Sequence, residues 1–98
     1  MKKISSEKNF NVYLLGDYLD IKHCDLIVTK QRTENETGKK QEYFICSVAL
    51  CYDNNELHIY KFDTGENYSA YKHNEYIEII YNAVIKHYKL KRKNLKLW

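Results

Sequence analysis

At 98 residues the chain has room for one domain and one core, and a hydrophobic fraction of 44% excludes a disordered protein. No apolar run is long enough to span a membrane, and the net charge of +3 divides unevenly along the chain. Three cysteines without a C-x-x-C pair indicate free thiols, and the basic start is not followed by the apolar segment of a signal peptide. We therefore expect a single domain over residues 1–98 that works in the cytoplasm, without a membrane partner.

The first third of the chain predicts strands after a polar start. Residues 1–9 are polar, and we expect a flexible end there. Residues 10–15 form a short apolar run closed by Gly16-Asp17, which is typical of a strand followed by a turn. Residues 18–29 alternate apolar and polar side chains, with a break at 23–25, so they predict either one bent strand or two short ones.

The middle of the chain predicts a hairpin after a polar loop. Residues 33–41 are the longest polar stretch and suit a mobile or binding loop. Residues 42–52 are the strongest strand pattern, apolar on both faces, which places this strand centrally in the sheet. Asp53-Asn54-Asn55 is a turn signal, and residues 57–62 follow as the hairpin partner.

Residues 74–90 predict an amphipathic α-helix. Its apolar side chains recur at steps of three and four, as expected for one helical stripe, at Ile77, Ile80, Tyr81, Val84, Ile85 and Tyr88. Asn74 is the expected N-cap, since its side-chain oxygen can accept a hydrogen bond from the first turn. With turns too short for parallel crossovers, we predict an α+β fold in which an antiparallel sheet of about four strands packs against this helix. Residues 91–98 form a basic C-terminal extension.

Three patterns suggest chemistry, and each has a simpler explanation. His23 and Cys24 are adjacent on a strand and point to opposite faces, so they do not form a nucleophile and base. The cysteines and histidines lack the close pairs of a zinc site, and we predict no metal and no cofactor. Asp53 and Glu56 resemble the acids of a metal-dependent nuclease only weakly, because Lys61 is too far along the chain.

The basic C-terminus is the most distinctive feature. All 13 acidic residues lie before residue 79, whereas residues 86–98 contain six lysines and arginines and no acid. Such a segment favours an acidic partner, either nucleic acid or an acidic protein surface. The predicted binding residues are Lys86, Tyr88, Lys89, Lys91, Arg92, Lys93, Lys96 and Trp98.

Composition also bears on origin. Lysine, asparagine, isoleucine and tyrosine, which have A/T-rich codons, account for 42 of the 98 residues. This predicts a gene from a low-GC bacterium or from a phage or mobile element living in one. We therefore expect a non-enzymatic binding protein, an accessory protein that inhibits a host defence complex in the anti-CRISPR manner, in the host cytoplasm. The alternatives are a nucleic-acid-binding module and, behind it, a small metal-dependent nuclease; exposed sheet edges and ten tyrosines also suggest a homodimer.

Overall fold

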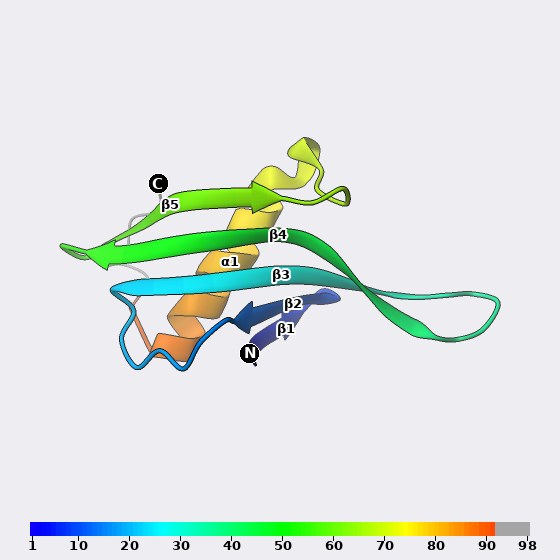
Figure 1. The fold of residues 1–98 in the computed structure, drawn as a ribbon, viewed down its shortest axis with the longest axis horizontal. Coiled ribbons are helices and arrows are strands. Elements are labelled where there is room, and N and C mark those ends of the chain that lie inside the picture. Colours follow the sequence, from blue (N-terminus) through cyan, green and yellow to red (C-terminus); the bar gives the residue numbers. More distant parts are fainter. Residues whose placement is uncertain (92–98) are drawn as a thin grey trace.

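The computed structural model describes residues 1–91, which form one sheet and one helix (Figure 1). The elements in chain order are β1 (Lys2–Glu7), β2 (Phe10–Leu14), β3 (His23–Thr33), β4 (Lys40–Asp53), β5 (Glu56–Thr64), the short 3-10 helix η1 (Ala70–Lys72) and α1 (His73–Tyr88). Each strand pairs antiparallel with the next in the chain, so the spatial order is β1-β2-β3-β4-β5. The α+β prediction is confirmed, with β4 inside the sheet as expected, but the sheet has five strands rather than four.

The strand missing from the prediction is β1, which lies in the segment expected to be flexible. It pairs with β2 through a two-residue turn in which Lys8 and Asn9 have φ angles of 52° and 69°. Positive φ at both positions is the geometry of a type I′ hairpin turn, which usually carries Asn-Gly. Without a glycine, and with Ile4 as its only strongly apolar residue, this strand has no clear sequence signal.

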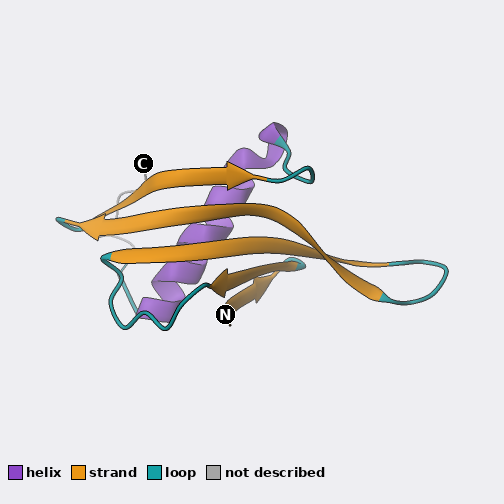
Figure 2. Cartoon of the chain, in the orientation of Figure 1, coloured by secondary structure: helices purple, strands orange, loops and turns teal. Residues whose placement is uncertain are grey.

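The other turns show where local chemistry predicted the structure. Asn54 and Asn55 have φ angles of 50° and 62°, so the predicted turn between β4 and β5 is confirmed. The predicted loop at 33–41 is confirmed at residues 34–39 but is shorter than expected, because β3 continues to Thr33 and β4 begins at Lys40. Figure 2 shows this long hairpin projecting beyond the rest of the sheet. Residues 15–22 connect β2 to β3 and form no strand, so β3 is a single strand with a bulge.

The core lies between α1 and one face of the sheet. Cross-strand neighbours share a face, and the row that faces the helix at the centre of the sheet is Leu14, Leu26, Val48 and Phe62. From the helix, six side chains are buried against this face: Tyr76, Ile79, Ile80, Tyr81, Ala83 and Val84. The buried stripe is rotated from the predicted one, since Ile77, Ile85 and Tyr88 lie at its margin.

The ends of α1 differ from the prediction. The helix begins at His73, after η1, so Asn74 lies inside the first turn and is not the N-cap. Lys72 takes that position and makes no side-chain capping bond. At the other end Lys89 has a left-handed backbone with φ of 55°, and its N–H donates to the Ile85 carbonyl. This is the C-terminal position at which glycine is most common.

We expect Lys89→Gly to raise the free energy of unfolding by about 0.5 to 1 kcal/mol, because glycine adopts a positive φ without the steric cost of a Cβ atom. Urea denaturation measures the effect. Lys86→Gly is the matched control: this exposed lysine lies within the last helical turn, where glycine should destabilise by a similar amount. Equal losses from both substitutions would contradict the prediction.

Candidate functional site

A basic hollow lies where the projecting hairpin leaves the body of the protein. It has a volume of about 510 Å³ and is lined by Asn9, Lys30, Gln31, Arg32, Thr33 and Lys40. Three of these six residues are cationic and none is acidic. We refer to this set of residues as the basic hollow.

Two segments that are distant in sequence build the basic hollow. Asn9 comes from the β1–β2 turn, and the other residues come from the base of the β3–β4 hairpin. The backbone N–H of Gln31 donates to the Asn9 carbonyl at 2.7 Å, which ties the turn to the hairpin. Lys30 pairs with Phe10, whose ring lies in the core, so Lys30 lies on the helix-facing side of the sheet.

Aromatic rings hold the cations in place. The Lys30 ammonium lies 5.0 Å from the centre of the Phe10 ring, and the Arg32 guanidinium lies 5.2 Å from that of Tyr43. Neither these two residues nor Lys40 forms an ion pair with any residue in 1–91. The Lys30 and Arg32 charges are therefore ordered by cation–π contacts, and none of the three charges is neutralised by an ion pair in the described part of the fold.

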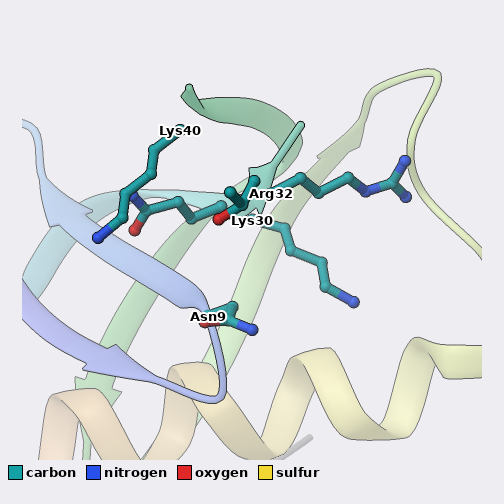
Figure 3. A pocket seen from close by; sticks show the side chains of 6 residues that line it. Asn9, Lys30, Arg32 and Lys40 are labelled. Carbon is teal, nitrogen blue, oxygen red and sulfur yellow. The ribbon is translucent and has the colours of Figure 1, made fainter. Parts of the chain in front are cut away.

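The charged ends of the basic hollow point apart. Figure 3 shows the Lys40 and Arg32 side chains extending to opposite sides, with Lys30 between them and Asn9 on the neighbouring turn. Such a fan does not converge on one small anion. It fits an extended acidic surface, which presents several negative charges to separate cations.

Glu42, a carboxylate on the same hairpin, forms its hydrogen bonds on the face of the sheet away from Lys30 and Arg32. Glu42 accepts hydrogen bonds from the Tyr13 hydroxyl at 2.7 and 2.8 Å and from Thr29 Oγ1 at 3.2 Å. Asn11 Nδ2 also donates to it at 3.3 Å, and the Glu42 carboxylate raises the pKa of Tyr13. Glu42 pairs with Gln31 in the ladder, one position from Lys30 and Arg32, so its side chain points away from these cations.

The residues predicted to bind a partner lie elsewhere. Lys86, Lys89 and Lys91 are exposed around the end of α1, at the far end of the molecule from the hairpin (Figure 1). Arg92, Lys93, Lys96 and Trp98 lie outside the described residues. The structure therefore brings together a basic site that the C-terminal charge pattern does not include.

Tyr88, the described aromatic member of the predicted site, packs into the domain. Burial raises its pKa to about 12, with smaller contributions from Cys24 and Asp20, and its hydroxyl is buried without a hydrogen-bond partner in the described part of the chain. This ring is therefore not displayed for stacking on a base.

We expect Tyr88→Phe to be at least as stable as the wild type at neutral pH, because it removes a buried hydroxyl without a partner. A raised folded-state pKa means that the wild-type tyrosine contributes stability below pH 10 and loses it as the pH rises towards about 12. The variant should lose less stability over that interval. Urea denaturation from neutral pH to above 10 checks both points, and parallel curves for the two proteins would contradict the second.

The cysteines differ in accessibility. Cys24 and Cys46 are buried in the core, and burial raises the pKa of each thiol to about 12. His23 lies on the opposite face from Cys24, with its ring 6.4 Å from that of Tyr60. His23 therefore does not activate the buried thiol of Cys24. Cys51 is partly exposed.

We expect Ellman's reagent to label one thiol per native chain rapidly, at Cys51, and all three after unfolding. At pH 8 a thiol with a pKa of about 12 is ionised to only about 10⁻⁴, and burial also blocks the reagent. Cys51→Ser should abolish the rapid phase. Rapid labelling that survives this substitution would contradict the assignment.

The acidic residues of the nuclease alternative are spread along a hairpin end. Asp53 and Glu56 pair across the β4–β5 turn, His58 Nε2 lies 3.1 Å from Glu56, and Lys61 pairs with Asp63 at 3.4 Å. Within residues 1–91 no group of three or more His, Cys, Asp and Glu side chains is placed to hold a metal ion.

Comparison of the chain with models of known protein families, with curated proteins and with solved structures finds no match. In the described part of the chain no helix is long and apolar enough to cross a membrane. The basic hollow is therefore the feature from which we infer a function. A sequence signal for it exists in retrospect: Lys30 and Arg32 are two apart, which places both on one face once the strand is extended to Thr33.

Proposed function

We propose that this chain is a non-enzymatic binding protein that attaches to another protein through the basic hollow. The observation that supports this is the set of three cations, Lys30, Arg32 and Lys40, which have no ion-pair partner among residues 1–91; two of these cations are ordered by aromatic rings. An acidic partner surface would supply the missing charges and gain charge-assisted hydrogen bonds from them. The hairpin that projects beyond these residues would add contact area beside the basic hollow (Figure 1).

The partner that we propose is a host macromolecular complex, and the consequence of binding is inhibition. The A/T-biased composition supports an origin in a phage or mobile element, for which blocking a host defence complex is a known use of small proteins. Enzymes that act on nucleic acids use carboxylates to hold catalytic metal ions, and a partner with several carboxylates spread around its active site would be complementary to these separated cations.

The second candidate function is nucleic-acid binding, which the same cations favour. Lys30, Arg32 and Lys40 would neutralise phosphates, together with Lys86, Lys89 and Lys91 at the far end of the molecule. Affinity would then fall steeply as salt concentration rises, because binding releases counterions from the nucleic acid.

A tagged pull-down from the lysate of a low-GC host, with and without nuclease treatment, separates the two candidates. A protein that is captured in both samples and lost with an Arg32→Glu bait supports the proposed function. Capture that disappears with nuclease supports the nucleic-acid candidate. Capture that is identical for the Arg32→Glu bait excludes the basic hollow as the binding site in either case.

A further inference from the structure

The face of the sheet opposite α1 is uncovered by any element of residues 1–91 (Figure 1, which looks onto this face). We refer to it as the open face. Besides polar side chains it carries exposed apolar ones: Leu15 is 42% exposed, and Tyr60 is 58% exposed. The solvent-facing side of an antiparallel sheet usually carries polar side chains. The exposed apolar side chains on the open face therefore suggest a contact surface.

The strand register places two rows of side chains side by side at the centre of the open face. One row is Tyr13, Ile27, Ser47 and Asp63, in pairs across β2, β3, β4 and β5. The next row is Asp25, Ala49 and Lys61, with Leu15 beside Asp25, to whose carbonyl its N–H donates at 3.0 Å. The small side chains Ser47 and Ala49 leave a shallow hollow of about 210 Å³ between the larger ones.

We propose that the open face is a homodimer interface in which two copies pack face to face. A two-fold axis that lies in the interface plane, across the strands and between the two rows, places each row over the other row of the second copy. Lys61 then lies over Asp63 of the second copy and Asp63 over its Lys61. Leu15 meets Tyr13, and the small pair Ser47 and Ala49 meet at the centre, where the two backbones approach most closely. Asp25 lies over Ile27 of the second copy, and its carboxylate keeps the hydrogen bond that it accepts from the Tyr18 hydroxyl at 3.3 Å.

An isologous interface requires a self-complementary surface, and the pattern meets this in charge at Lys61 and Asp63 and in shape at Ser47 and Ala49. The pair between Lys61 and Asp63 within one copy spans 3.4 Å, with side chains 67% and 59% exposed, so little stability is lost when it is exchanged for the intermolecular pairs. With strands about 4.8 Å apart, the face measures roughly 20 × 25 Å, which is near the lower size limit of specific interfaces. We therefore expect micromolar affinity. Lys30 and Arg32 of each basic hollow lie on the helix-facing side and stay accessible, which would make the dimer bivalent.

The test uses the exchange of charge between copies. Sedimentation equilibrium of the wild type, from low micromolar to several hundred micromolar protein, should show a monomer–dimer equilibrium. Lys61→Asp places acids at both positions and Asp63→Lys places lysines at both, so each variant alone should dimerise at least about tenfold more weakly. A mixture of the two variants should regain dimers, because every intermolecular pair is then attractive. Both positions are exposed, so the fold should be unaffected.

Lys86→Glu, an exposed position on α1 at the other side of the sheet, is the control and should leave the dimer constant unchanged. The proposal is overturned if the wild type stays monomeric throughout the concentration range. It is also overturned if both single variants dimerise like the wild type, or if their mixture gains nothing. A host protein captured through the basic hollow neither supports nor opposes the dimer, so the two proposals fail separately.

Discussion

Replacing Ile80 with alanine is expected to lower the free energy of unfolding by about 3 to 4 kcal/mol. Ile80 is fully buried at the centre of α1, where it packs against the helix-facing side of the sheet. The loss combines the transfer of the removed methylene and methyl groups with the cost of the cavity that remains. Because one helix is the whole second layer within residues 1–91, no neighbouring element can move in to fill the space.

Urea denaturation followed by circular dichroism measures this change, and Ile77→Ala is the matched control. Ile77 is on the same helix but only partly buried at the margin of the core, so its truncation should cost about 1 kcal/mol. Equal losses of unfolding free energy at the two positions would mean that the helix does not pack on the sheet through the face that contains Ile80.

Reversing two charges in the basic hollow, Arg32→Glu with Lys40→Glu, is expected to weaken binding to the captured host protein by about 100-fold or more, since each charge-assisted contact contributes about 1.5 to 3 kcal/mol. Neither side chain forms an ion pair within residues 1–91, so the reversal should leave thermal stability nearly unchanged. Biolayer interferometry against the captured protein measures the affinity, and the melting temperature of each variant is recorded in parallel.

The matched control reverses Lys86 and Lys89, which are exposed at the far end of α1. It introduces the same change in net charge, so any long-range electrostatic effect should be shared by both double variants. A loss that is confined to the Arg32 and Lys40 pair locates the site in the basic hollow. If the Lys86 and Lys89 pair causes the larger loss, the C-terminal prediction is the correct one.

The parts of the fold with a strong local signal were predictable from the sequence. The helix follows from apolar steps of three and four, and the β4–β5 hairpin follows from two asparagines that tolerate a positive φ. The residue at which the helix starts was not predictable, because η1 precedes the helix and Lys72 makes no side-chain capping bond. β1 was not predictable because its mostly polar residues give no strand pattern, and it is held by pairing with β2 and by Ile4, which packs against the core.

The sequence by itself determined the α+β class, because hydrophobic periodicity and turn chemistry are properties of neighbouring residues. It also determined the uneven charge of the chain. Only the tertiary structure decided which cations gather, since Asn9 reaches Lys30 and Arg32 through a hydrogen bond between a turn and a distant strand. It decided likewise that Glu42 is engaged on one face while Lys30 and Arg32 remain unpaired within residues 1–91 on the other. Strand register sets both outcomes, and a shift of one residue would exchange the two faces.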